Sequence, residues 1–245
     1  MTRVKICGVR DAETAREAVR AGADFIGMVF AESKRQVTPL QCHEVVTAIR
    51  ETRQSQEVAR IEGPRRDEVR GASWFGAWNE AIDDSLARWR PLIVGVFADQ
   101  EVADANEIVE AAGLELIQLS GGEDDQFVHQ VRSPVLKVVH VHPETTADDV
   151  LETTAPGAAA GILLDTESES LRGGTGKTFN WQVAAEVGQR LPLMLAGGLS
   201  PSNVADAVSL AQPWAVDVSS GVETAGVKDI EKMRAFIRAA KGISQ

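Results

Sequence analysis

The sequence predicts an α/β fold, a single (β/α)8 TIM barrel that spans residues 1–245. Eight short apolar segments alternate with helical patterns along the chain. Most of these segments are continuously apolar, as in parallel strands that are covered on both faces. Eight strand–helix units favour closure into a barrel, for which 245 residues is a usual length. A doubly wound open sheet is the structural alternative.

The elements follow one another from the start of the chain. Strands are expected at residues 3–7, 24–30, 92–97, 115–119, 135–140, 161–165, 192–196 and 214–219. Helices are expected at residues 11–21, 38–53, 72–90, from 99 onward, and at 124–132, 146–153, 180–190, 201–211 and 227–241.

Local signals predict where three of the helices begin. Thr38 precedes Pro39 and Ser200 precedes Pro201, which is the pattern of an N-cap residue with proline in the first turn. Asp99 is expected to begin the helix that follows the third strand.

The connection between the second helix and the third strand is much longer than the roughly 2–6 residues that such links need. We interpret residues of about 54–90 as an insertion within the barrel domain. Its first part is dense in charges of both signs, and its second part, Ala72 to Arg90, carries apolar residues at helical spacing. Because it leads into a strand, this helix should lie at the end of the barrel opposite the chemistry. Its aromatic stripe is expected to be buried, the alternative being a partner or dimer surface formed by Trp74, Phe75, Trp78, Ile82, Leu86 and Trp89.

Composition excludes several classes of function. The net charge is −11, which argues against nucleic acid as a partner because phosphate backbones need a basic face. No apolar run approaches the roughly 20 residues needed to cross a bilayer, and the chain enters its first strand without a signal segment. We therefore expect a cytoplasmic protein without a membrane partner.

The four histidines, His43, His129, His140 and His142, form no metal-ligand pattern with acids or cysteines, so no metal is expected.

Two side chains that can transfer protons end predicted strands. Cys7 ends the first strand and Asp165 the sixth, and barrels of this kind keep their chemistry at the carboxyl ends of strands. A thiol there could act as a nucleophile or a general base, although a free cysteine is more often buried. The glycine and polar turn after Cys7 favour exposure. Asp165 either faces a site or caps the following turn.

Three glycine-rich turns follow the last three strands. Gly173, Gly174 and Gly176 lie in the loop after Asp165, where bare backbone N–H groups could approach an anion; the loop lacks the first glycine that a nucleotide P-loop needs. The other two turns contain Gly197 with Gly198, and Ser219 with Ser220 and Gly221. Turns after strands seven and eight are a usual phosphate site in barrels.

Two further charged features complete the predicted site. Lys5 and Asp217 have the same inward parity as Cys7 on neighbouring strands, so we expect a buried ion pair that holds the thiol or tunes its pKa. Arg35, in a basic turn after the second strand, could grip a carboxylate through two parallel hydrogen bonds. A solvated basic turn is the plainer alternative.

Together these motifs resemble the phosphoribosylanthranilate isomerase family of tryptophan biosynthesis. The matching segments extend along the chain except at about 54–90. They are Lys5-Ile6-Cys7-Gly8, Gly22-Ala23-Asp24-Phe25-Ile26-Gly27, Ser33-Lys34-Arg35, Val94-Gly95-Val96-Phe97, Gln118-Leu119, Leu163-Leu164-Asp165, Gly173-Gly174-Thr175-Gly176-Lys177-Thr178-Phe179, Gly197-Gly198-Leu199 and Asp217-Val218-Ser219-Ser220-Gly221-Val222-Glu223.

The resemblance implies a cofactor-free Amadori rearrangement of a small phosphosugar, with a (β/α)8 barrel as the scaffold. It implies that Cys7 is the general base for the C2′ proton and Asp165 the general acid for the furanose ring oxygen. Arg35 would then contact the anthranilate carboxylate, and the three glycine turns would hold the phosphate. The chain would act as a monomer or a homodimer.

The chain departs from the family pattern at one candidate position. The family usually has His-Gly after the Gln-Leu pair, and here the two residues are Ser120 and Gly121. Two other functions are retained as alternatives: another phosphosugar isomerase or epimerase barrel, and a non-catalytic barrel that keeps the phosphate site. An epimerase would normally bring a metal, and the presence of both Cys7 and Asp165 argues against loss of the reaction.

Overall fold

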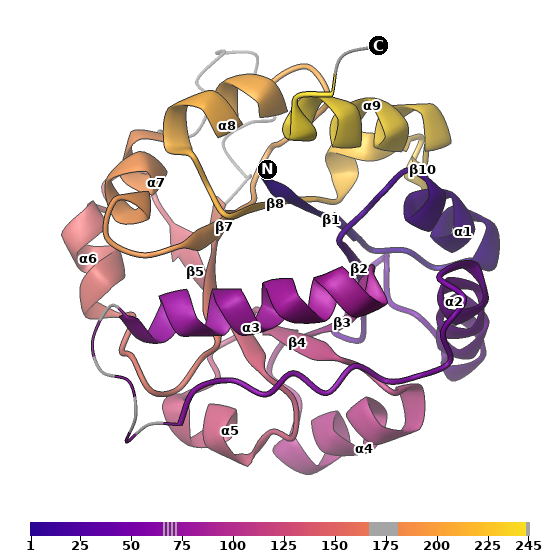
Figure 1. Cartoon of the computed structure of the whole chain (residues 1–245), viewed down its shortest axis with the longest axis horizontal. Coiled ribbons are helices and arrows are strands. Elements are labelled where there is room, and N and C mark those ends of the chain that lie inside the picture. The colour runs from indigo at the N-terminus through magenta and orange to yellow at the C-terminus, as the bar shows by residue number, and fades with distance from the viewer. Residues whose placement is uncertain (66, 68, 70, 72, 167–180, 244–245) are drawn as a thin grey trace.

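Eight parallel strands form a closed barrel in chain order, from β1 to β8 (Figure 1). The computed structural model describes residues 1–65, 67, 69, 71, 73–166 and 181–243. Strand β1 pairs with β2 on one side and with β8 on the other, which excludes the open sheet. The strands are β1 Arg3–Cys7, β2 Phe25–Val29, β3 Leu92–Phe97, β4 Leu116–Leu119, β5 Val135–Val141, β6 Gly161–Thr166, β7 Leu193–Leu195 and β8 Ala215–Val218.

Helices surround the barrel and cover the outward faces of its strands, and one further helix lies across an end of the barrel (Figure 1). They are α1 Ala12–Arg20, α2 Pro39–Thr52, α3 Ser73–Trp89, α4 Val102–Ala112, α5 Asp125–Gln130, α6 Ala147–Glu152, α7 Trp181–Gly188, α8 Val204–Ala211 and α9 Ile230–Lys241. Side chains alternate along each strand between two buried clusters, one facing these helices and one filling the barrel interior.

One of the three predicted helix starts is confirmed and two are wrong. Thr38 caps α2 through a capping box, with Pro39 in the first turn. Asp99 instead lies in a turn with a φ of +60°, and α4 begins at Val102. Helix α8 begins only at Val204, because the Asn203 side chain bonds the backbone of residues 198 and 200 and holds the segment between them as a turn.

The chain after β8 contains elements that the sequence did not predict. A 3-10 turn, η2 Ser220–Val222, leads into a small hairpin of β9 Glu223–Thr224 and β10 Val227–Lys228. Helix α9 therefore begins three residues later than expected. Its N-cap is Asp229, whose carboxylate accepts hydrogen bonds from the N–H groups of Glu231 and Lys232.

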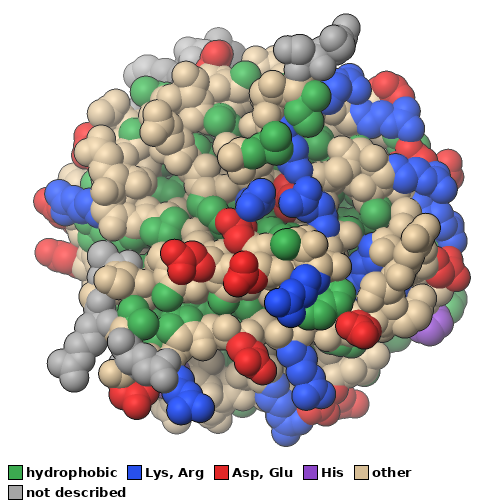
Figure 2. All heavy atoms as spheres, viewed as in Figure 1, with side chains coloured by type: hydrophobic (Ala, Val, Ile, Leu, Met, Phe, Trp, Pro, Cys, Tyr) green, Lys and Arg blue, Asp and Glu red, His purple; other side chains and the backbone are tan. Residues whose placement is uncertain are grey.

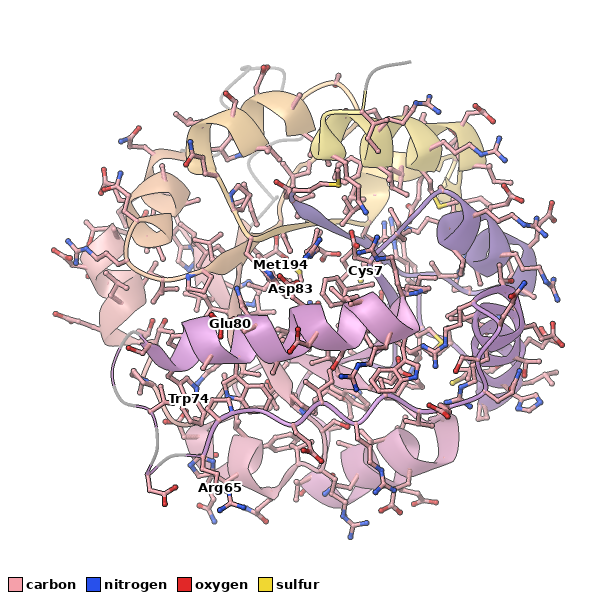
Figure 3. All side chains as sticks on the ribbon, in the orientation of Figure 1. Cys7, Arg65, Trp74, Glu80, Asp83 and Met194 are labelled. Atoms are coloured by element: carbon pink, nitrogen blue, oxygen red, sulfur yellow. The ribbon has the colours of Figure 1, made fainter. Side chains whose placement is uncertain are left out.

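Helix α3 crosses one end of the barrel (Figures 1 and 3). This is the amino-terminal end, because Asp83 of α3 accepts a hydrogen bond from Arg3 at the start of β1, so α3 lies opposite the strand ends that carry Cys7 and Asp165. Trp74 Nε1 donates to the carbonyl of Ala159, just before β6, at 2.7 Å. Four residues of the predicted apolar stripe, Trp74, Phe75, Ile82 and Leu86, are buried, and Trp78 and Trp89 are half-buried. Figure 2 shows acidic and basic side chains interspersed over this face of the molecule.

A buried ion pair anchors the beginning of the long connection to the barrel. Arg53 Nη2 lies 2.9 Å from Glu115 Oε1, and the two side chains are 1% and 0% exposed. Glu115 also accepts the N–H groups of Ala59 and Ile93. The interpretation of residues 54–90 as an insertion within one domain stays a prediction. Within the part of the chain that the structure describes, no helix is long and apolar enough to cross a membrane.

Candidate active site

The carboxyl ends of the strands bring the predicted acid and base to one end of the barrel. Cys7 is the last residue of β1 and packs with Val29 and Val96 of the next two strands. Asp165 on β6 lies two residues after Leu163, which faces the barrel interior. Residues two apart on a strand share a face, so the Asp165 carboxyl group also faces inward. The half-buried Asp165 and the buried Cys7 thus lie at the same end of the barrel.

Lys5 forms the ion pair expected from strand alternation, together with a partner that the sequence analysis did not assign. Its ammonium group is fully buried and lies 3.1 Å from Asp217 Oδ1 and 2.8 Å from Gln118 Oε1. Gln118 in turn donates to Ser120 Oγ at 3.1 Å. A polar residue at an inward position of an apolar strand was the signal that could have identified Gln118.

Gly27 makes room for the lysine and the thiol to approach each other. It pairs with Cys7 in the register of β1 and β2. A Cβ atom at Gly27 would lie 3.1 Å from Cys7 Sγ and 3.1 Å from Lys5 Nζ. Both groups therefore crowd the same point, and a hydrogen at this position is what allows them to do so.

Burial and neighbouring charges act in opposite directions on the pKa values of Lys5 and Cys7. Burial disfavours the charge on Lys5, but Asp217 and Cys7 outweigh it, so the pKa of Lys5 lies above its usual value and the group stays a cation. Burial raises the pKa of the Cys7 thiol, and the positive charge of Lys5 acts in the opposite direction. Lys5 therefore stabilises a thiolate at Cys7, and Lys228 acts more weakly in the same direction.

Arg35 lies at the mouth, but a protein carboxylate already holds it. Its Nε and Nη2 donate to the two oxygens of Glu223 at 2.7 and 2.9 Å, which leaves Nη1 and the second hydrogen of Nη2 outside this pair. Lys228 Nζ also donates to Glu223, at 2.8 Å, and to the carbonyl of Ser219. Burial opposes ionisation of Glu223, yet the hydrogen bonds from Arg35 and Lys228 lower its pKa to about 2.

Neither Glu223 nor Lys228 was identified as a site residue in the sequence. Lys228 lies on the hairpin after β8, an element that the sequence did not predict, so nothing indicated that it returns to the mouth. Gly8 has a φ of +76° and lets Arg35 cross above β1, since a Cβ there would lie 2.7 Å from Arg35 Cδ.

The glycine turns after β7 and β8 pack directly against each other. Gly197 and Gly198 both have positive φ angles, and a Cβ at Gly221 would lie 1.8 Å from the carbonyl oxygen of Leu199. Ser219 Oγ donates to the carbonyl of Cys7 at 3.2 Å, which ties this region to the end of β1; Ser220 begins η2. The third predicted turn, with Gly173, Gly174 and Gly176, lies outside the described residues.

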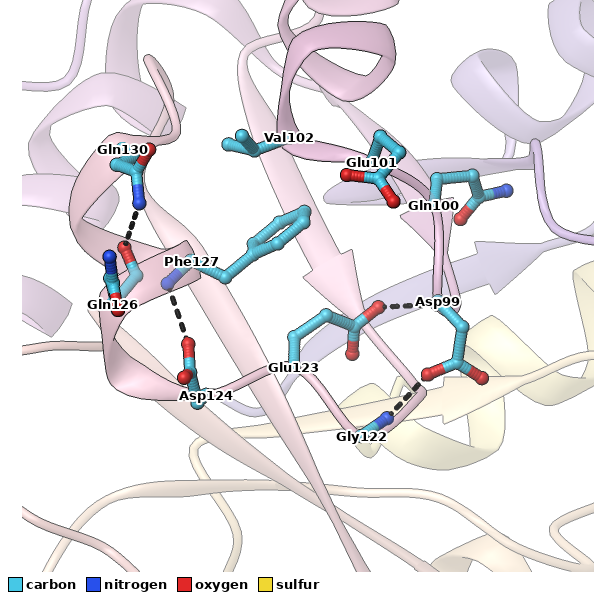
Figure 4. Close-up of a pocket in the computed structure, with 10 residues that line it drawn as sticks. All are labelled: Asp99, Gln100, Glu101, Val102, Gly122, Glu123, Asp124, Gln126, Phe127 and Gln130. Atoms are coloured by element: carbon cyan, nitrogen blue, oxygen red, sulfur yellow. Dashed lines mark hydrogen bonds between the residues drawn. The ribbon is translucent and has the colours of Figure 1, made fainter.

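Two hollows on the outside of the barrel do not contain the acid or the base. One lies between the loops after β3 and β4 (Figure 4), and its carboxylates bond those loops: Glu123 accepts the N–H of Asp99, and Asp99 accepts the N–H of Gly122. The other lies between α2 and α4. Among the described residues, no group of histidines, cysteines and acids could hold a metal ion.

Sequence comparison matches the chain to one enzyme family. The family model described as N-(5'phosphoribosyl)anthranilate (PRA) isomerase matches residues 75–239. The chain is 36% identical over 246 residues to the N-(5'-phosphoribosyl)anthranilate isomerase of Dehalococcoides mccartyi, covering 98% of this chain and 96% of that protein. It is 40% identical to a multifunctional tryptophan biosynthesis protein of Phycomyces blakesleeanus but spans only 33% of that protein's length.

Solved structures of the same family share the fold. A structure of monomers generated from the dimeric phosphoribosylanthranilate isomerase of Thermotoga maritima has a TM-score of 0.72 and 30% identity, covering 99% of this chain and 100% of that one. A phosphoribosylanthranilate isomerase in complex with reduced 1-(o-carboxyphenylamino)-1-deoxyribulose 5-phosphate has a TM-score of 0.69 and 29% identity, with the same coverage.

Proposed function

Since the chain belongs to the N-(5'-phosphoribosyl)anthranilate isomerase family, we infer that it catalyses this isomerisation in tryptophan biosynthesis. The reaction converts N-(5'-phosphoribosyl)anthranilate to 1-(2-carboxyphenylamino)-1-deoxyribulose 5-phosphate. The observation that carries the proposal is the placement of Cys7, backed by the Lys5 ammonium group, at the same end of the barrel as Asp165. One solved relative binds a reduced form of the product at 29% identity.

We propose that two proton transfers drive the rearrangement. Asp165 donates a proton to the furanose ring oxygen, the bond from that oxygen to C1′ breaks, and the anthranilate nitrogen forms a double bond to C1′. The Cys7 thiolate then removes the proton from C2′, and the electron pair forms a C1′–C2′ double bond while the nitrogen regains its lone pair. The resulting enolamine tautomerises to the ketone. No step requires a cofactor or metal.

In this proposal the surrounding residues support the thiolate and the two anionic ends of the substrate. Lys5, held by Asp217 and Gln118, supplies the positive charge beside Cys7. The turns at Gly197–Gly198 and Ser219–Gly221 face the phosphate through backbone N–H groups, which glycine leaves accessible. Arg35 reaches the anthranilate carboxylate through Nη1 while Glu223 holds the rest of the guanidinium group.

Turnover of phosphoribosylanthranilate by the purified chain tests the function directly, because the substrate loses its fluorescence as it reacts. We expect turnover without added metal and no effect of a chelator. Absence of turnover with retained phosphosugar binding would instead support a non-catalytic barrel, and turnover of a different phosphosugar would support another isomerase. Sedimentation would distinguish a monomer from a homodimer, and cell fractionation would test the expected cytoplasmic location.

A further inference from the structure

A histidine that neither the motifs nor the resemblance assigns lies beside the proposed general acid. His140 on β5 is the register partner of Asp165 on β6, which puts their backbones about 5 Å apart on neighbouring strands. His140 shares one face of β5 with Leu136 and Val138, which pack in the barrel interior. Its side chain therefore faces inward, as that of Asp165 does. His140 and Asp165 therefore lie next to each other on neighbouring strands at the same end of the barrel.

A hydrogen bond to β4's end fixes the protonation pattern of the ring. His140 Nε2 lies 3.1 Å from the carbonyl oxygen of Ser120. A carbonyl oxygen only accepts, so Nε2 carries the hydrogen, and in the neutral ring Nδ1 is left as a proton acceptor. The side chain is also exposed to solvent. The ring therefore has one nitrogen bonded to the protein and a second that can accept a proton from water and pass it on.

We propose that His140 returns a proton to Asp165 between turnovers. This inference rests on the proposed role of Asp165 as the general acid. Each turnover leaves Asp165 without the proton that it gave to the ring oxygen and leaves Cys7 with the proton from C2′. His140 takes a proton from water on Nδ1 and transfers it to the Asp165 carboxylate, while Cys7 releases its proton to water. The exchange is balanced and consumes no net proton.

The departure at Ser120 agrees with this assignment. The chain has serine where the family usually has histidine, and the carbonyl of that serine is the group that orients His140. The imidazole thus enters the mouth from β5 rather than from the end of β4.

His140→Gly tests the proposal, because it removes the ring and leaves space for free imidazole. We expect kcat to fall at least about tenfold, within the range of general acid–base effects. KM should stay within about twofold, and added imidazole should restore part of kcat. His140→Gln can still donate to the Ser120 carbonyl but cannot carry the proton, so it should show the same loss in a protein that melts normally. His43→Ala, on the exposed surface of α2, should change neither value.

A second pair of variants asks whether the proton passes through Asp165. The double variant Ser120→His/His140→Gly should recover part of kcat without imidazole, since it supplies the ring from β4. Imidazole should not stimulate Asp165→Asn. Normal kcat in both His140 variants would overturn the proposal, and so would a loss confined to KM or equal stimulation of Asp165→Asn. Inactivity of the unaltered chain would instead overturn the proposed function.

Discussion

The ammonium group of Lys5 lies 3.1 Å from the Asp217 carboxylate inside the barrel, two residues before the thiol of Cys7 on the same strand. Lys5 is 0% exposed, so water contributes little to holding its charge. Charges are costly to bury, and this one is retained beside Cys7, which must ionise to act as the proposed general base. We therefore interpret the pair as part of the catalytic machinery, and its removal should affect stability and activity separately.

Lys5→Met should cost about 3–5 kcal/mol of unfolding free energy, because it leaves the Asp217 carboxylate buried without its cation. Adding Asp217→Leu should recover much of that stability, since a buried pair can be replaced by apolar residues. Activity should stay low in both variants, as neither provides a cation for Cys7. Urea unfolding and steady-state kinetics measure the two effects, and a fully active Lys5→Met protein would refute the role of the pair.

Gly27→Ala should lower kcat/KM about tenfold with little loss of stability. The new methyl group would lie 3.1 Å from both Cys7 Sγ and Lys5 Nζ, so both must move by a few tenths of an ångström, and small displacements of reacting groups are costly. Gly161→Ala is a matched control, because its methyl group would lie 3.1 Å from Leu136 Cδ2, away from the thiol. Equal kinetics of the two variants would contradict the prediction.

The rate at which Cys7 reacts with an alkylating agent should keep rising as the pH increases well above neutrality. Burial raises the pKa of its thiol more than Lys5 lowers it, so the thiolate fraction of the empty enzyme increases with pH through neutrality. The alkylation rate by iodoacetamide, measured in a Cys42→Ser background, should follow this rise, and Lys5→Met should shift it to higher pH. Burial raises the pKa of Cys42 to about 11, so its removal should change the rate little.

The same shift has a defined consequence for stability. Because the folded-state pKa of Cys7 lies above the unfolded value, its contribution is fully present below the unfolded pKa and is lost as pH rises through the folded pKa. Cys7→Ser should therefore unfold with a weaker dependence on alkaline pH. A plateau of the alkylation rate below neutral pH would contradict both expectations.

Glu223 should make the mouth sensitive to acid. Its pKa of about 2 lies below the usual value of 4.5, so its stabilising contribution is present above the unfolded pKa and is lost as pH falls through the folded one. Glu223→Gln should unfold with a flatter dependence on pH between about 4.5 and 2. It should also raise KM, since Arg35 loses the partner that orients it. An unchanged acid profile in urea titrations would count against this interpretation.

The sequence was sufficient for the barrel because its signals are local and repeated. Apolar strands ending in Cys7 and Asp165 were enough to predict the fold and to place both side chains at one end of it, and alternation was enough to pair Lys5 with Asp217. These inferences need only a periodicity of two and the order of the strands.

What could not be predicted depends on how side chains bend the chain locally. The Asn203 side chain delays α8, and the hairpin after β8 returns Lys228 to the mouth, which no periodicity encodes. Arg35 was correctly placed at the mouth, but its bidentate contact with Glu223 joins residues 188 positions apart. His140 was dismissed because it matched no metal pattern, although its register with Asp165 gives it a different use.

Arg53→Met should separate the stability of the barrel from its chemistry. Arg53 and Glu115 form a buried pair at the amino-terminal end, where Arg53 also donates to the carbonyls of Trp89 and Pro91. Its loss leaves a buried carboxylate unpaired, so the free energy of unfolding should fall by about 3–5 kcal/mol. Because Cys7 lies at the opposite end of β1, kcat/KM of the folded protein should stay near normal.

Arg132→Met provides the matched control for that measurement. It breaks the pair between Arg132 and Glu110, whose side chains are 62% and 60% exposed, and such surface pairs contribute about 0–1 kcal/mol. Denaturant unfolding of both variants should therefore show a large loss only for Arg53→Met. If the two variants unfold alike, the Arg53–Glu115 pair does not anchor the connection between α2 and β3. If kcat/KM of folded Arg53→Met falls sharply, the two ends of the barrel are coupled, and the separation of stability from chemistry fails.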